Sequence, residues 1–350
     1  MINIDGRALN DSSPPLLIAE ISANHKKSLS RALKLVKMAA KAGFDAIKLQ
    51  TYEADKITLK LKKKDFQIRD KKSIWYKRNL YDLYKKGQTP KIWHKKIFNE
   101  AKKLGLIAFS TPFDLDSVKF LKKLKVPCYK ISSFEITYLE LIKECAKTKK
   151  PLIISTGLAK FSEIKKAISE IKKVGNNKII LLKCSSSYPA NPEDINLKTL
   201  LDLKKRFKLD VGLSDHTIGS EVAIASIPYG VKIIEKHITV NNKDGALDSK
   251  FALPIKEFKN FVNSIKNTHK ALGKIQYGPT NNEKNSLRYR RSIYVSHTIK
   301  KGERISKHNI KIVRPSLGMP IKYYKKILGK RTNKSFYPGD VIKLKNLKRN

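Results

Sequence analysis

Two histidines, His216 and His237, each end a short run expected to form a β-strand, in the stretches VGLSDHTIG and VKIIEKHIT. Their spacing along the chain is that of one strand–helix–strand step. If the two strands are parallel neighbours, both imidazoles project from the same end of one sheet. Two neutral imidazoles there could hold a divalent metal and leave positions open for water and substrate. The alternative is a pair of hydrogen-bonded histidines near strand ends.

Polar side chains also follow the other β-rich runs of the chain. Lysines and hydroxyls predominate among them, which suits an anionic ligand such as a phosphate that also carries a carboxylate. The residues at these predicted strand ends are Glu20, Asn24, His25, Lys48, Gln50, Ser110, Thr111, Lys130, Ser133, Glu135, Ser155, Thr156, Lys183, Tyr188, Ser214 and Lys236.

Several of these residues have a second interpretation. Glu20 could be the buried ion-pair partner of one of the lysines. Lys48 or Lys130 could form a Schiff base with a carbonyl substrate, as in an aldolase. Ser155 and Thr156, which precede a glycine, could belong only to a turn or a helix cap. A Schiff base needs one amine with a lowered pKa, so several lysines at one site fit anion binding better.

The elements that must position these residues alternate regularly between strand and helix. Eight such alternations lie between Leu16 and Leu272, and eight is the number that closes an α/β barrel of the (β/α)8 TIM type, with its site at the carboxyl ends of the strands. A doubly wound open sheet is the competing fold. No GxGxxG motif follows the first strand, which argues against its dinucleotide-binding form. Predicted strands include 16–21, 46–50, 106–110, 128–133, 151–155 and 178–183, and predicted helices 28–42, 93–104, 116–124, 162–174, 196–207, 220–229 and 254–272.

Two segments depart from this alternation. Residues 51–90 form a long, charged insertion with several tyrosines, and loops of this length inside a domain are more often functional than structural. After Gly273 the pattern changes to short strands and turns, with strands expected at 292–295, 310–313 and 341–344. We therefore expect a barrel domain over 1–275, a linker over 276–290 and a small β-rich domain over 291–350. The last is too small for a generous core and is expected to dock on a barrel.

The composition limits the cellular setting and the partners. The formal net charge is +45, but lysine greatly outnumbers arginine and is spread over most of the helical segments. The sequence has no arginine-rich arm and no alternation of aromatic and basic residues, the features that are typical of a nucleic-acid-binding surface. The three cysteines, Cys128, Cys145 and Cys184, have no paired spacing, which suits a reducing cytosol. Without a signal peptide or a long apolar run, we expect a cytoplasmic protein that binds neither nucleic acid nor membrane.

Several long motifs resemble the sialic acid synthase family, whose members condense phosphoenolpyruvate with an N-acetylated sugar to make nonulosonic acids. They are IAEISANH, AIKLQTYEAD, STPFDLDSV, KISSFEIT, STGLAKFSEI, LLKCSSSYPANPEDINL, VGLSDHTIG and IEKHITV. The C-terminal motifs RRSIYVSHTIKKGE, VRPSLGM and YPGDVIKL resemble that family's SAF (antifreeze-like) domain. The resemblance implies a barrel followed by a SAF domain that crosses to the partner's barrel in a domain-swapped homodimer.

The resemblance also implies roles for individual residues. His216 and His237 would hold a divalent metal, Mn²⁺, Mg²⁺ or Co²⁺, and Glu135 would be the acid/base carboxylate. Phe134 stands where many members of the family have a glycine, which puts the local backbone in question. The residues implied around phosphoenolpyruvate are Lys48, Thr111, Lys130, Ser133, Ser155 and Ser214, and those around the sugar are Gln50, Tyr188, Asp248 and Arg314.

The acceptor sugar is suggested by four further segments, YEADKITL, LYDLYKKGQTP, DGALDSKFALP and GPTNNEKNSLRYRRSIYV. They look more like pseudaminic acid synthases than N-acetylneuraminate synthases, which tend to have a histidine where this chain has Ser249 after Asp248. The implied acceptor is 2,4-diacetamido-2,4,6-trideoxy-L-altrose, with N-acetylneuraminate or legionaminate synthesis as the alternatives. A polyanion-binding protein that uses the high positive charge is the alternative from a different class.

Overall fold

The computed structural model describes residues 1–348 of the chain, which divides into two compact units. The first unit ends at Gly273 and the second begins at Lys274. Each unit has its own hydrophobic core, and each is described here by itself.

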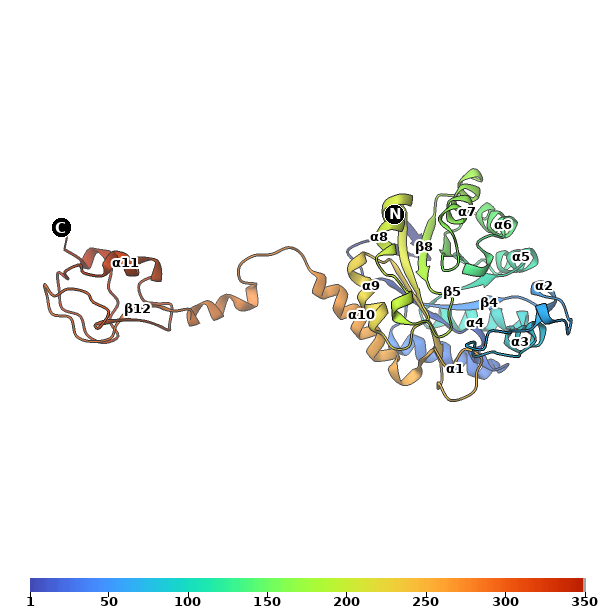
Figure 1. Cartoon of the computed structure of the whole chain (residues 1–350), viewed down its shortest axis with the longest axis horizontal. Helices are drawn as coiled ribbons and strands as arrows, with labels where there is room; N and C mark the ends of the chain where they lie inside the picture. The colour runs from blue at the N-terminus through green and yellow to red at the C-terminus, as the bar shows by residue number, and fades with distance from the viewer. Residues whose placement is uncertain (349–350) are drawn as a thin grey trace. The chain divides into compact units, whose positions relative to one another are not determined.

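Parallel strands form a closed barrel in the first unit (Figure 1). Within residues 1–348, eight strands follow one another in chain order, and β10 pairs with both β9 and β3, which closes the ring. Closure excludes the open doubly wound sheet and confirms the predicted (β/α)8 TIM barrel. The strands are β3 (Leu16–Glu20), β4 (Ala46–Thr51), β5 (Ile107–Pro112), β6 (Tyr129–Ile131), β7 (Leu152–Ser155), β8 (Ile179–Cys184), β9 (Asp210–Asp215) and β10 (Ile233–Thr239).

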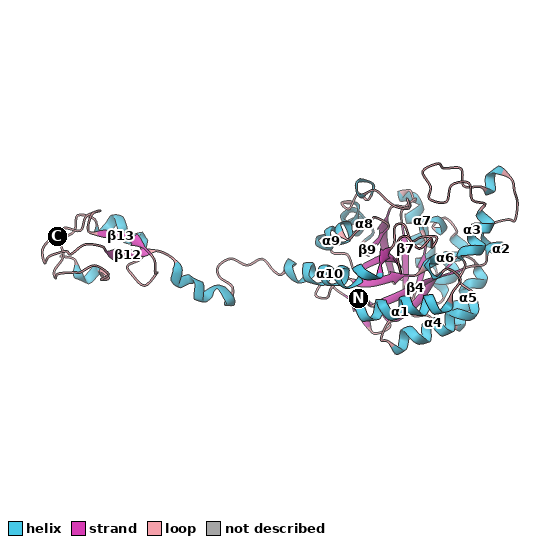
Figure 2. Ribbon diagram, turned by 90° about the horizontal axis from the view of Figure 1, so that it is seen from below, coloured by secondary structure: helices cyan, strands magenta, loops and turns pink. Residues whose placement is uncertain are grey.

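Amphipathic helices surround these strands (Figure 2). In α1, for example, the buried residues Ala32, Leu35, Val36 and Ala39 recur with the helical period and pack on the barrel. The helices are α1 (Leu29–Ala42), α4 (Lys91–Lys103), α5 (Leu115–Lys123), α6 (Leu139–Lys147), α7 (Phe161–Lys173), α8 (Thr199–Phe207), α9 (Glu221–Ser226) and α10 (Phe258–Leu272). Each predicted helix overlaps one of them, whereas α6 was not predicted.

Short elements lie before the first barrel strand and after the last one. An antiparallel hairpin that the sequence did not suggest joins β1 (Ile2–Ile4) to β2 (Arg7–Leu9). The predicted last helix begins later than expected, because Leu253 and Pro254 form the strand β11 on β10 and a 3-10 turn precedes Phe258.

The insertion between β4 and α4 is ordered. It contains the helices α2 (Ala54–Ile57) and α3 (Leu80–Gly87). Between them the backbone of Ile68 pairs with Arg78 and Lys77, and the Asn79 side chain donates to the Leu61 carbonyl at 2.7 Å. These contacts fold the segment back on itself, so that it presents its side chains in a defined arrangement.

Gly212 on β9 lies where the barrel wall leaves no room for a side chain. A Cβ at this position would lie 2.6 Å from the Ile233 carbonyl and 2.6 Å from the Leu182 side chain. We expect Gly212→Ala to lower the free energy of unfolding by about 1–3 kcal/mol, because overpacking forces neighbouring groups to move. Urea denaturation measures this loss, and an unchanged midpoint would show that the wall can yield.

The second unit is a small β-rich fold. The strands β12 (Ser292–Val295) and β13 (Ile310–Val313) pair antiparallel over a core that includes Phe336 and Ile327 of α11 (Tyr324–Ile327). A 3-10 helix, Asn281–Tyr289, precedes β12 and buries no residue. The prediction of a strand at 341–344 is wrong. The Asn346 side chain accepts from the backbone N–H of Lys343 at 3.1 Å, and the chain enters a 3-10 turn there instead.

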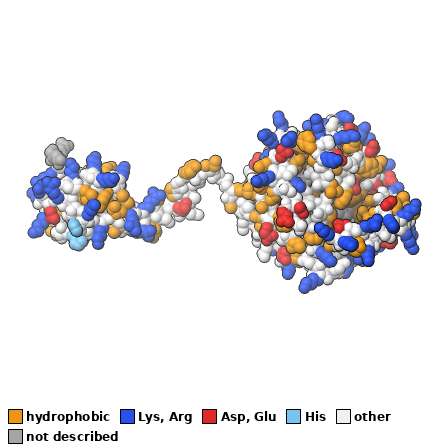
Figure 3. All heavy atoms as spheres, in the orientation of Figure 1, with side chains coloured by type: hydrophobic (Ala, Val, Ile, Leu, Met, Phe, Trp, Pro, Cys, Tyr) orange, Lys and Arg blue, Asp and Glu red, His pale blue; other side chains and the backbone are white. Residues whose placement is uncertain are grey.

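On the face drawn in Figure 3, Lys and Arg side chains are scattered over both units. Among residues 1–348, no helix combines the length and the apolar character needed to cross a membrane.

Candidate active site at the carboxyl ends of the barrel strands

The strand register brings the predicted site residues of the barrel to one end. Side chains alternate along a strand, so residues two apart share a face. His237 is paired with Glu20, and Glu20 with Lys48, across three neighbouring strands. On the far side of β10, Glu235 is paired with Ser214 of β9. Arg314, the remaining predicted sugar contact, lies in the second unit.

Buried ionic contacts connect the two predicted lysines. Lys48 pairs with Glu20, lies 3.7 Å from a Glu235 oxygen and donates to the Thr111 hydroxyl at 3.2 Å. The Lys130 ammonium lies 3.3 Å from the same Glu235 oxygen. The expectation that Glu20 pairs with a lysine is thereby confirmed.

Glu20, Lys48, Lys130 and Glu235 form an ionic cluster, whose charges depend on burial and on the contacts among its members. Burial would lower the pKa of Lys48, but the Glu20 and Glu235 carboxylates raise it above the usual value. Burial would raise the pKa of Glu235, but Lys130 and Lys48 hold it below the usual value. For the other two residues burial dominates: it lowers the pKa of Lys130 and raises the pKa of Glu20. Lys48 therefore stays cationic, and Glu20 is the carboxylate that accepts a proton most readily.

The two histidines lie side by side, with ring centroids 5.2 Å apart. His216 Nδ1 is 2.7 Å from the Ser185 carbonyl, which can only accept, so the proton sits on Nδ1 and the Nε2 lone pair is available. Burial lowers the pKa of His216 to about 4. Burial and the neighbouring positive charges also put the pKa of His237 well below its usual value. Both rings are therefore neutral at pH 7, the form that binds metals.

The residues present fit a divalent metal. His237 Nδ1 is buried, has no hydrogen-bond partner within residues 1–348, and stands 3.8 Å from the Asp248 carboxylate. Two imidazoles are suitable ligands for a divalent transition metal. No group of three or more His, Cys, Asp or Glu in the described part of the chain is arranged to hold a metal.

Unpartnered polar atoms gather at this end of the barrel. Within residues 1–348, the buried side-chain atoms without a hydrogen-bond or ion-pair partner include Ser155 Oγ, Glu235 Oε2, Glu20 Oε1 and His237 Nδ1, with Arg7 Nε as the exception elsewhere. Buried polar groups normally find partners, and exceptions mark strain or binding sites. The distribution indicates that this mouth is built to receive a polar ligand.

Hydroxyl groups line the side of the site formed by β6, β7 and β8. The Ser133 and Ser186 hydroxyls are 2.7 Å apart. Gly157 allows this wall to pack closely, since a Cβ there would lie 2.6 Å from both Cys184 Sγ and Ser186 Oγ. Ser214 donates to Glu235 at 3.1 Å, which connects the hydroxyls to the ionic cluster.

Glu135 ends a 3-10 turn, Ser133–Glu135, directly after β6. The Phe134 side chain is 58% exposed, so its bulk points to solvent and does not displace Glu135. Burial raises the pKa of Glu135, against the opposing effects of the Ser132 hydroxyl and the Lys130 charge. A raised pKa brings a carboxyl group closer to the range in which it can act as a general acid or base.

An aromatic wall stands beside the histidines. The Tyr188 ring lies 4.6 Å from His216, 5.2 Å from Phe251 and 5.6 Å from Trp75, between ring centroids. Phe251 also packs against His237 at 5.0 Å. Tyr188 is thus held between the histidine pair and a residue of the insertion.

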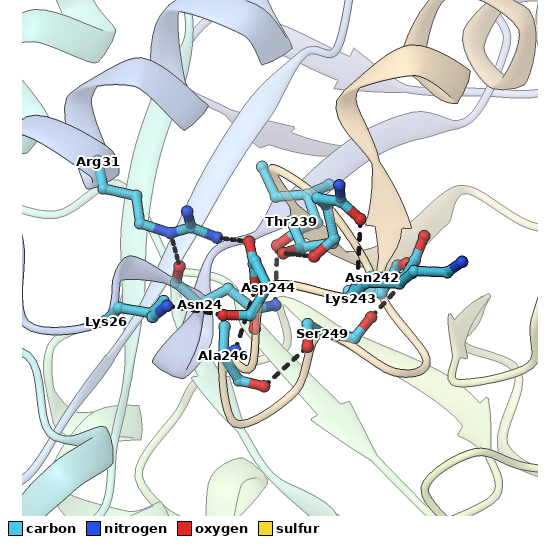
Figure 4. Close-up of polar contacts among 12 residues, drawn as sticks. Asn24, Lys26, Arg31, Thr239, Asn242, Lys243, Asp244, Ala246 and Ser249 are labelled. Carbon is cyan, nitrogen blue, oxygen red and sulfur yellow. Dashed lines mark hydrogen bonds and ion pairs between the residues drawn. The ribbon is translucent and has the colours of Figure 1, made fainter.

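The loop after β10, which carries Asp248, is tied to the start of α1 (Figure 4). Arg31 pairs with the Asp244 carboxylate and donates through Nε to the Asn24 carbonyl at 2.7 Å. The Asn24 side chain accepts from the Asp248 backbone N–H at 3.2 Å and donates to the Ile238 carbonyl at 2.8 Å. Asp248 is thereby fixed next to His237.

Three residues at the site were missed by the sequence analysis. Glu235 lies four residues before the end of β10 and two before His237, inside an apolar run, where only strand ends were considered. Alternation with His237 could have revealed it. Trp75 lies in the insertion, and Phe251 in the loop after β10, and neither position follows from strand spacing.

Comparison with known proteins supports one family. The chain is 42% identical over 334 residues to pseudaminic acid synthase of Campylobacter jejuni, covering 95% of this chain and 97% of that one. It is 36% identical to N,N'-diacetyllegionaminic acid synthase of the same species, covering 94% and 98%. Among solved structures, N-acetylneuraminic acid synthetase of Leptospira borgpetersenii superposes with a TM-score of 0.71 at 30% identity, covering 82% of this chain and 95% of that one.

Family models match both units. The NeuB family model matches residues 35–277, and the SAF domain model matches residues 290–348. These matches cover most of the chain and agree with the barrel and with the small β-rich unit. The chain therefore belongs to the NeuB family of nonulosonic acid synthases and carries a SAF domain.

Proposed function

We propose that this protein is a pseudaminic acid synthase. It condenses phosphoenolpyruvate and water with 2,4-diacetamido-2,4,6-trideoxy-L-altrose, giving pseudaminic acid and phosphate. The observation that carries the choice of acceptor is the identity of 42% to pseudaminic acid synthase of Campylobacter jejuni, against 36% to the legionaminic acid enzyme of the same species. The barrel mouth supports the chemistry, because buried lysines stand beside two neutral imidazoles.

Phosphoenolpyruvate binds at the lysine and hydroxyl side of the mouth in this proposal. Lys48 keeps its charge through Glu20 and Glu235 and can interact with an anion, and the Lys130 ammonium lies 3.3 Å from a Glu235 oxygen. Hydroxyls hold the remaining oxygens of the phosphate and carboxylate. They belong to Thr111, Ser133, Ser155 and Ser214, and the Ser155 hydroxyl has no other partner within the described chain.

The sugar binds on the histidine side. Gln50, Tyr188 and Asp248 contact it, with Tyr188 and Asp248 directly beside His216 and His237. Arg314 reaches the N-acetyl region from the SAF domain of a partner chain, in a domain-swapped homodimer. A Mn²⁺, Mg²⁺ or Co²⁺ ion on the two histidines supplies Lewis acidity at the open-chain aldehyde.

The reaction joins C3 of phosphoenolpyruvate to the aldehyde carbon of the sugar. Positive charge then develops at C2, water adds there, and the tetrahedral intermediate loses phosphate by C–O cleavage. Glu135 moves protons in these steps, for which its raised pKa is suited. The lysines and hydroxyls hold one substrate, and the histidines and Tyr188 hold the other. Keeping the two substrates aligned in this way itself lowers the activation barrier of the reaction.

Purified full-length protein tests the proposal. With phosphoenolpyruvate, Mn²⁺ and the trideoxy sugar it should release phosphate, and EDTA should stop the release until Mn²⁺ is restored. Phosphate release with N-acetylmannosamine but not with the trideoxy sugar would refute the pseudaminate assignment. Trapping of the protein by borohydride with pyruvate would indicate a Schiff-base aldolase instead. Tight, salt-sensitive binding to nucleic acid without any phosphate release would indicate a polyanion-binding protein.

A further inference from the structure

We infer that Trp75, presented by the insertion between β4 and α4, forms an apolar wall of the acceptor-sugar site and selects sugars with a methyl rather than a hydroxymethyl end. The inference rests on the proposed function, because it names the residue that would set acceptor specificity at the same site.

Two contacts place Trp75 between residues of the proposed sugar site. Its ring packs against Tyr188, with centroids 5.6 Å apart. Its indole N–H donates to the Leu247 carbonyl at 3.0 Å, and Leu247 directly precedes Asp248. Trp75 therefore contacts both chain segments that carry Tyr188 and Asp248, although it lies far from them in sequence.

The surrounding backbone fixes this placement. The Trp75 N–H donates to the Ser73 hydroxyl at 3.2 Å, and its carbonyl accepts from the Arg78 N–H at 3.0 Å. At the return point of the insertion, the Thr89 hydroxyl is 3.1 Å from His25 Nε2. Both His25 and Thr89 are buried, so the insertion is anchored on the barrel at the segment that follows β3.

The chemistry that Trp75 can offer a ligand is apolar. Indole has a single hydrogen-bonding group, its N–H, and here that group is used by the Leu247 carbonyl. What remains is the ring surface, next to Tyr188, whose own ring packs against Phe251. Such a wall accommodates a methyl group, whereas a hydroxyl placed against it loses water without gaining a partner.

Steady-state kinetics of Trp75→Ala test the inference in the full-length protein. We expect kcat/KM for the trideoxy sugar to fall about tenfold or more, while KM for phosphoenolpyruvate stays within about twofold. The preference for that sugar over N-acetylmannosamine should fall about tenfold, because space replaces the apolar wall. Trp75→Phe keeps a ring against Tyr188 and should restore part of the loss.

Tyr76→Ala is the matched control. Tyr76 is the neighbouring aromatic residue, 37% exposed, and contacts the Lys77 ammonium rather than the wall. Its removal should leave both the sugar KM and the preference unchanged. Equal effects of the Tyr76 and Trp75 variants would reduce Trp75 to a loop-stabilising residue and overturn the inference.

Fluorescence gives a readout without turnover. The chain has two tryptophans, so Trp93→Phe leaves Trp75 as the sole reporter. Addition of the trideoxy sugar to the Mn²⁺-loaded variant should change its emission, and an unchanged emission together with an unchanged sugar KM in Trp75→Ala overturns the inference. If the wild type uses only N-acetylmannosamine, the proposed acceptor fails. The KM of that sugar in Trp75→Ala then decides whether Trp75 contacts the substrate.

Discussion

Lys48→Met is expected to reduce phosphate release by at least about a thousandfold, because the variant loses the cation that faces the phosphoenolpyruvate anion. It is also expected to lower the free energy of unfolding by about 3–5 kcal/mol, since Glu20 and Glu235 then lose a buried partner. Lys48 is 3% exposed and contacts both carboxylates, so solvent cannot replace it. Phosphate assays and urea denaturation measure the two effects.

A double variant separates stability from function. Lys48→Met with Glu20→Gln removes one unpaired carboxylate and should recover part of the stability while leaving activity lost. Lys256→Met is the control, because Lys256 has an 80% exposed side chain and lies 4.0 Å from Glu257, so neither property should change. Activity that returns with stability in the double variant would show that Lys48 is structural and not a ligand of the anion.

His237→Ala is expected to lower phosphate release by about a thousandfold and to reduce bound Mn²⁺ below one ion per chain. His216→Ala should act similarly, because its free Nε2 is the other ligand in the proposal. Metal analysis of the purified variants after dialysis gives a readout that does not depend on turnover. His297→Ala serves as control, since His297 is exposed and its Nδ1 contacts the His308 carbonyl.

Metal retention separates the alternatives for the histidine pair. Full Mn²⁺ content in both His216→Ala and His237→Ala would contradict the assignment and leave the pair as two packed, neutral histidines. Loss of metal with unchanged turnover would instead exclude a catalytic role for the ion. Only the joint loss of metal and activity agrees with the proposal.

The barrel could be predicted from the sequence because each strand–helix step has its own local pattern. The run Leu16–Glu20 is wholly buried, and α1 follows it with a helical period and Ser28 as N-cap. Parallel strands in a barrel place their carboxyl ends together, so polar residues at those ends share a site. That rule located Lys48, Lys130 and the two histidines without knowledge of their contacts.

The remaining parts of the site depend on contacts between distant segments. Glu235 contacts Lys48 and Lys130 from other strands, which the run IIEKHI does not reveal by itself. Trp75 reaches Tyr188 only because the insertion folds over the mouth, and a long charged segment has no periodicity from which that path follows. In the second unit, the expected strand at 341–344 failed because the Asn346 side chain turns the chain locally.

The central claim is that the chain joins phosphoenolpyruvate to a diacetamido trideoxy sugar with cleavage of the C–O bond. The most direct measurement uses phosphoenolpyruvate labelled with ¹⁸O at the bridging oxygen and identifies the products by mass spectrometry and NMR. We predict that the label leaves in phosphate and that the organic product is pseudaminic acid. Label retained in the organic product, or a product without a new carbon–carbon bond, would contradict the account.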